Sequence, residues 1–103
     1  MKYFKHEKIP LNDNCLPNNI THLEFDDLFN HELIKLPDSI TNLIFGEKFN
    51  KSIINKLSNE LLYLTFGTEF NQSVDKLPTK LIHLTFGYKF NQNVDSLPDS
   101  IEY

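Results

Sequence analysis

Histidine is the first residue type in this chain that could do chemistry, as a metal ligand. His22 and His83 occupy equivalent places in a sequence repeat, three repeat units apart. Strands stacked at about 4.8 Å would separate them by about 14 Å, whereas two ligands of one zinc ion each lie about 2 Å from it. His6 and His31 have no cysteine or carboxylate at a recognisable ligand spacing. The sequence therefore predicts no metal site and no cofactor.

Paired carboxylates are the second possibility. Asp75 and Asp95 occupy equivalent places in neighbouring units, and a close pair of carboxylates is what a glycosidase uses for catalysis. Each lies two residues before a Leu-Pro pair, where aspartate is common because it suits turns. No serine, cysteine or threonine is placed so that the repeat would bring it to a histidine and an orienting acid. We therefore expect solvated turn residues, no catalytic residues and a protein that is not an enzyme.

Composition and charge narrow the remaining function classes. The 103 residues carry a formal net charge of −4, and no segment gathers lysines into a stripe. The attraction that drives binding to nucleic acid or to an anionic membrane is therefore missing. Cys15 is the single cysteine, the charged N-terminal segment is unlike a signal peptide, and no stretch approaches the roughly 18 apolar residues of a membrane span. We expect a cytoplasmic protein whose partner is another protein.

An internal repeat dominates the chain. The segment LTFGTEFNQSVDKLP at residues 64–78 returns as LTFGYKFNQNVDSLP at residues 84–98. Alignment on the Leu-Pro pair gives four units of 20 or 21 residues, which start at Leu16, Leu36, Leu57 and Leu77. A partial unit follows at 97–103. We predict an N-terminal cap at 1–15 and a repeat solenoid at 16–103, because units of this length bury a core only by stacking.

Conserved slots within the units indicate how they stack. Eight phenylalanines fall in two columns: Phe25, Phe45, Phe66, Phe86 and then Phe29, Phe49, Phe70, Phe90. An asparagine follows the second column every time, at Asn30, Asn50, Asn71 and Asn91. All three glycines share one slot, Gly46, Gly67 and Gly87, where the first unit has Asp26.

These slots predict a mainly β solenoid. The leucine-to-phenylalanine stretch alternates with period 2 and favours a short strand, and a 20-residue coil leaves little room for a helix. Parallel stacking makes the phenylalanine columns into interior ladders and lets the asparagine amides link successive coils. Glycine directly after the strand predicts either a bend at positive φ or a tight backbone approach.

The pattern L-P-x-S-[IL]-x-x-L-x-F-G-x-x-F-N-Q-x-[IV] resembles the FNIP repeat over residues 16–103. This repeat is a relative of the leucine-rich repeat found in slime-mould proteins and in proteins of amoeba-infecting giant viruses. The resemblance implies a leucine-rich-repeat-like fold and a binding role, in the host cytoplasm if the protein is viral. Members often carry an F-box ahead of the repeats and recognise substrates for ubiquitination. Only fifteen residues precede the first unit here, too few for an F-box.

Outward strand positions differ between units, so we expect binding there. The two outward columns and one residue beyond the glycine bend make up this set: His22, Asn42, Tyr63, His83, then Glu24, Ile44, Thr65, Thr85, and Tyr88. Tyr63, Ile44 and Tyr88 are the expected anchors, because aromatic residues are enriched at binding hot spots. The alternative is a solvated sheet face with incidental aromatic residues.

The ends of the solenoid suggest a second hypothesis. At the front, Tyr3, Phe4, Ile9 and Leu11 are expected to cover the first coil. At the back, the fifth unit stops where its strand is expected, so either the natural chain continues or a partner, such as a second copy forming a homodimer, covers this edge. The protein would then be a structural or assembly element that associates through its C-terminal edge.

Charged residues also form columns. The column Leu28, Lys48, Glu69, Lys89 alternates in sign, which favours pairing between adjacent coils. Lys35, Lys56 and Lys76 instead align as like charges, an arrangement that lowers stability unless Asp75 or solvent screens it.

Overall fold

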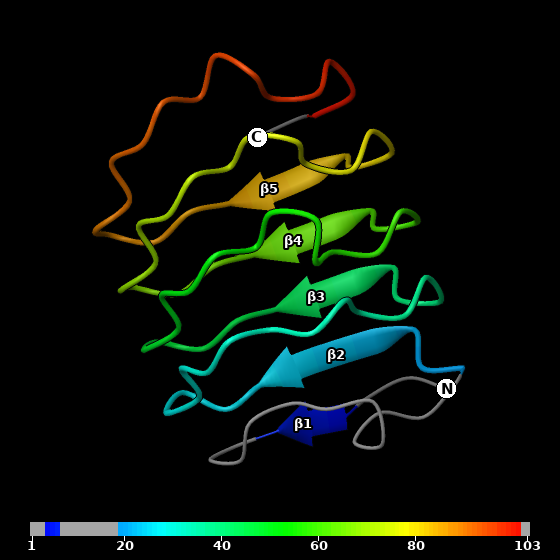
Figure 1. Cartoon of the computed structure of the whole chain (residues 1–103), viewed down its shortest axis with the longest axis vertical. Coiled ribbons are helices and arrows are strands. Elements are labelled where there is room, and N and C mark those ends of the chain that lie inside the picture. The colour runs from blue at the N-terminus through cyan, green and yellow to red at the C-terminus, as the bar shows by residue number, and fades with distance from the viewer. Residues whose placement is uncertain (1–3, 7–18, 102–103) are drawn as a thin grey trace.

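The computed structural model describes residues 4–6 and 19–101, and within these ranges the regular structure consists of short strands without a helix. The strands are β1 Phe4–His6, β2 His22–Phe25, β3 Asn42–Ile44, β4 Tyr63–Thr65 and β5 His83–Thr85. They form one parallel sheet in sequence order, and the chain returns through a loop between successive strands (Figure 1). The predicted fold, a mainly β solenoid with one short parallel strand in each repeat, is confirmed.

The strands of successive units pair in register. Tyr63 lies opposite His83, Leu64 opposite Leu84 and Thr65 opposite Thr85. The leucine in each of the strands β2–β5 points inward and is buried, so the residues before and after it face outward. The assigned strands begin one residue before the expected leucine-to-phenylalanine stretch. Pairing nevertheless continues past them, because the amide of Phe66 still donates to the carbonyl of Thr85 at 2.9 Å.

Two phenylalanine ladders fill the interior. In the first, ring centroids of successive coils lie 5.0, 5.5 and 5.9 Å apart. In the second they lie 6.1, 6.0 and 6.2 Å apart. The two ladders also stack on each other within every coil, at 4.5 Å in the first coil and 3.7 Å in the fourth. Because each ring needs the coil above and below it, the core belongs to the stack and to no single unit.

The glycine column marks a close approach between coils. None of the described glycines has positive φ. A Cβ added at Gly46 would lie 2.5 Å from the carbonyl oxygen of Asp26, and one at Gly67 would lie 2.6 Å from the carbonyl carbon of Gly46. Of the two predicted reasons for glycine, the structure shows the tight backbone approach. Positive φ occurs instead at Asn55 and Lys76, in the turns that end the second and third units.

The asparagine column links the coils, because each asparagine side chain accepts a hydrogen bond from a main-chain amide of the next coil. The amides of Asn50, Asn71 and Asn91 each donate to Oδ1 of the asparagine one coil earlier, at 2.8, 2.9 and 2.9 Å. Gln72 and Gln92 add to these contacts, because each donates its Nε2 to the same asparagine Oδ1, at 3.0 and 2.9 Å. The column therefore satisfies main-chain amides where no strand ladder exists.

Asn71→Ala should lower the free energy of unfolding by about 0.5–1.5 kcal/mol, because it removes the acceptor of the Asn91 amide and one of the two acceptors of the Gln92 side chain. The matched variant Asn71→Asp keeps an acceptor oxygen and should therefore lower the free energy of unfolding less than Asn71→Ala does. Urea denaturation followed by circular dichroism measures both. Equal losses in the two variants would contradict the role given to Oδ1.

The two ends of the stack differ. Strand β1 pairs with β2, with Phe4 opposite Leu23, while residues 1–3 and 7–15 of the predicted cap lie outside the described residues. Toward the other end, Phe86 and Phe90 are only partly buried, and Leu97 and Ile101 pack against the core.

Candidate binding face and its groove

A groove of about 250 Å³ crosses the outer face of β2, β3 and β4. Its walls are the two outward columns, which here comprise His22, Asn42, Tyr63 and Glu24, Ile44, Thr65. Leu23 and Leu43 lie between the walls, and because their side chains point inward, their main chain forms the floor. The groove is smaller than a typical small-molecule pocket. Its size suits single side chains of a partner better than a cofactor.

Two apolar side chains in the groove are open to solvent. Ile44 is 42% exposed and Tyr63 is 39% exposed, although both belong to strands of a well-packed sheet. The ring of Tyr63 stacks on that of His83, with centroids 5.0 Å apart and planes 9° apart. This stack extends the face from β4 to β5 and holds Tyr63 in place, so the ring would lose little conformational entropy when a partner covers it.

Local hydrogen bonds orient the polar side chains of the first outward column. Thr41 donates its hydroxyl to Oδ1 of Asn42 at 2.9 Å, and the Thr21 hydroxyl lies 2.9 Å from Nδ1 of His22. These contacts come from the residue directly before each strand. The sequence therefore sets both the side chain and its orientation at these two positions.

The structure brings most of the predicted binding residues together. Six of the nine line the groove: His22, Glu24, Asn42, Ile44, Tyr63 and Thr65. His83 joins them through its stack on Tyr63, and Thr85 lies opposite Thr65 on β5. Tyr88 is apart from them, because it lies past the close approach at Gly87 and is 92% exposed. Leu28 is a further exposed apolar residue, at 58%, which sequence reasoning missed although it stands in a column of charged residues.

The carboxylates considered for catalysis lie in turns. The amide of Asp75 donates to Oγ of Ser73 at 3.2 Å, and the amide of Asp95 donates to Oδ1 of Asn93 at 2.7 Å. Within residues 4–6 and 19–101, no group of three or more His, Cys, Asp or Glu side chains could hold a metal ion. The same part of the chain has no helix that is long and apolar enough to cross a membrane.

The ion pairs lie at the surface. Glu69 pairs with Lys89 at 3.2 Å within the column predicted to alternate in sign, and Glu60 pairs with Lys80 at 2.7 Å. Exposed pairs of this kind each contribute about 0–1 kcal/mol.

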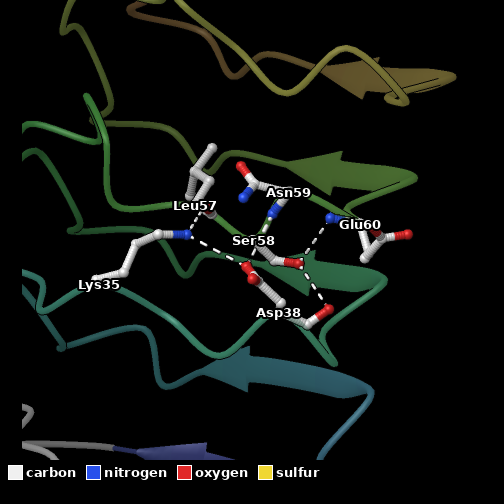
Figure 2. Close-up of polar contacts among 6 residues, drawn as sticks. All are labelled: Lys35, Asp38, Leu57, Ser58, Asn59 and Glu60. Atoms are coloured by element: carbon white, nitrogen blue, oxygen red, sulfur yellow. Dashed lines mark hydrogen bonds and ion pairs between the residues drawn. The ribbon is translucent and has the colours of Figure 1, made fainter.

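A third ion pair joins Asp38 to Lys35, at 3.4 Å (Figure 2). The pKa of the Asp38 carboxyl lies below its ordinary value, chiefly because the amide of Asn59 donates to it and also because the Lys35 ammonium is beside it.

The neighbouring Ser58 stands where three other units have proline, and it is buried. Its hydroxyl donates to the carbonyl of Asp38 at 3.2 Å and accepts from the amide of Glu60 at 3.0 Å (Figure 2). The serine therefore replaces the rigidity of proline with hydrogen bonds to its own turn and to the coil before it.

Comparison with known proteins agrees with this architecture. Among solved structures, the chain is similar to CroV588, a giant-virus protein whose crystal structure is described as a novel circular LRR protein structure, where LRR stands for leucine-rich repeat. The two share 43% sequence identity with a TM-score of 0.82, over 97% of this chain and 15% of that chain. No curated protein matches the chain. The leucine-rich-repeat-like character of the fold is thereby confirmed.

The family assignment comes from the repeats themselves. The sequence model of the FNIP repeat family matches residues 9–48, 29–68, 49–89 and 70–103. Together these matches include all four repeat units and the partial fifth one. Repeat scaffolds of this kind are typically not enzymes, and their fold suggests protein interaction in general. The chain belongs to the FNIP repeat family.

Proposed function

We propose that this protein is a non-enzymatic interaction module that binds a partner protein through the outer face of β2–β5. The observation that carries the proposal is the groove, whose walls hold the exposed apolar side chains of Ile44 and Tyr63. Exposed apolar groups bordered by polar ones are typical of interaction sites.

The repeat itself supports this placement. Inward positions repeat almost unchanged because the ladders require them, whereas the groove walls change from coil to coil. The first wall runs His22, Asn42, Tyr63 and the second runs Glu24, Ile44, Thr65, so each step along the stack offers different chemistry. A partner can therefore bind at one particular position along the stack, whereas a face with identical side chains on every coil would not distinguish one position from the next.

Ile44→Asp and Tyr63→Ala should each reduce partner capture at least tenfold, because truncating or charging a central apolar contact removes about 2 kcal/mol or more. Both side chains point outward, so the variants should keep the thermal midpoint within a few degrees of the wild type. The measurement is quantitative affinity purification from cell lysate with immobilised protein. It compares the proteins retained by wild type with those retained by each variant.

Leu28→Asp is the matched control, because Leu28 is also an exposed aliphatic residue but lies outside the groove. It should retain the wild-type set of proteins. If Leu28→Asp removes that set while Ile44→Asp and Tyr63→Ala keep it, the binding face lies elsewhere on the solenoid.

Further expectations from the sequence stay predictions. They are a link to ubiquitination, association with a second copy through the C-terminal edge, the absence of nucleic-acid and membrane partners, and a cytoplasmic location. The proposal depends on none of them, because the groove is complete within β2–β4.

A further inference from the structure

A second cavity, of about 170 Å³, lies at the turns that end the repeat units, away from the outward strand face. Its polar lining comes from three successive coils and consists of Lys35, Asn55, Asn59 and Lys76. Ile53 and Leu57 border the cavity as buried core residues, and Pro78 completes its lining. The cavity therefore presents mainly cationic and amide groups, and the nearby carboxylate of Asp38 is bonded to Lys35 and to the amide of Asn59.

The extra residue of the second unit explains why the cavity has this lining. Lys35 and Lys76 stand in equivalent places, and the lysine expected between them is Lys56. In the longer turn, the amide of Lys56 donates to the carbonyl of Ile53 at 3.1 Å, and Asn55, at φ 61°, faces the cavity instead. The insertion thus replaces the middle cation of the column with a neutral amide.

Lys35 is held in a fixed position beside the cavity. Its ammonium donates to the carbonyl of Leu57 at 2.7 Å and to Oδ1 of Asp38 at 3.4 Å, and Figure 2 shows the side chain reaching across to both. An ammonium group has three donors, so one N–H remains for a ligand. The contact with Leu57, itself a lining residue, keeps this donor at the cavity.

Lys76 is the second cation in the lining of the cavity. The two residues lie two coils apart, about 10 Å at the strand spacing, and both line the same cavity. In the part of the chain that the structure describes, Lys76 makes no ion pair or hydrogen bond through its ammonium. Asp38 pairs with Lys35, whereas neither Asp75 nor any other described carboxylate forms an ion pair with Lys76, so an anion in the cavity would gain a charge contact with Lys76.

We propose that this cavity binds a small phosphate monoester, with the phosphate between Lys35 and Lys76 and the rest of the ligand beside Pro78, the remaining lining residue that is partly exposed. The side-chain amides of Asn55 and Asn59 supply further donors for the phosphate oxygens. The volume is too small for a nucleotide and suits a phosphate on a single ring or short chain. The site is independent of the strand-face groove.

Phenyl phosphate is the probe, titrated into the whole chain against sodium chloride at matched ionic strength, with nitrogen-15 nuclear magnetic resonance as the readout. Matching the ionic strength removes general screening from the comparison. The side-chain amide signals of Asn55 and Asn59 should shift and saturate, while those of Asn42, in the strand-face groove, should not move.

Lys76→Asn removes one cation and suits the backbone, because asparagine tolerates a φ of 62°. It should raise the dissociation constant for phenyl phosphate about fivefold or more, which is the effect of losing one charge contact of about 1 kcal/mol. Lys80→Asn is the control with the same change of charge, since Lys80 pairs with Glu60 and does not line the cavity, and it should bind as the wild type does. Equal weakening in both variants, or shifts that do not centre on Asn55 and Asn59, would overturn the proposal.

Discussion

Phe49→Ala should lower the free energy of unfolding by about 3–5 kcal/mol, the range for removing a buried aromatic ring. Phe49 is 0% exposed and lies in the middle of the second ladder. Its ring stacks on Phe45 at 4.1 Å, on Phe29 at 6.1 Å and on Phe70 at 6.0 Å. Its loss would leave a cavity with three unpaired ring faces, which the stacked coils cannot close without breaking their register. Urea denaturation followed by circular dichroism measures the effect.

Phe90→Ala is the matched control at the end of the same ladder. Phe90 is partly buried and stacks on Phe70 at 6.2 Å and on Phe86 at 3.7 Å. Its truncation should destabilise the protein by roughly half as much or less, because part of the ring already faces solvent. If Phe49→Ala leaves no folded population to measure, the milder variant Phe49→Leu should still lower the free energy of unfolding more than Phe90→Leu does. Equal losses at the two positions would contradict a core built from continuous ladders.

Gly67→Val should lower the free energy of unfolding by at least about 2 kcal/mol, because a side chain forced into packed backbone moves the chain. A Cβ at this position would lie 2.6 Å from the carbonyl carbon of Gly46 and 2.9 Å from the Cα of Glu47. To relieve this contact, the third coil must move away from the second. The amide of Glu69, which donates to the carbonyl of Glu47 at 3.0 Å, would then lose its bond.

Thr68→Ala is the control next to this glycine. Thr68 follows the bend and is partly exposed, so truncation should change the free energy of unfolding by no more than about 0.5 kcal/mol. Thermal and urea denaturation of the two variants give the comparison. A denaturation midpoint unchanged by Gly67→Val would contradict the explanation that a close backbone approach requires glycine in this column.

The fold could be predicted because its packing rules repeat. A column of four identical residues at a fixed spacing, such as the asparagines after the second phenylalanine, leaves few alternatives to a stack of coils. The strand alternation around Leu64 likewise predicted which side chains face outward, and the structure has Leu64 buried with Tyr63 exposed. The reason for glycine could not be settled in this way, because only the distance between neighbouring backbones separates a close approach from positive φ.

The sites could be predicted only in part. The outward columns follow from alternation, but a groove between them depends on how far Ile44 and Tyr63 project, which varies with their neighbours. The cavity between Lys35 and Lys76 depends on an insertion that places Asn55 in its lining, and the alignment of the lysines alone could not predict it. Departures from a repeat, in contrast to the repeat itself, have local consequences that need coordinates.

Site-specific photo-crosslinking tests the central claim, that partners bind the strand-face groove, most directly. A benzoylphenylalanine placed at position 65 lies in the groove, and one placed at position 28 is exposed outside it. In cell lysate, the proposal predicts adducts to the captured partner from position 65 and none from position 28. Adducts from position 28 without adducts from position 65 would contradict it.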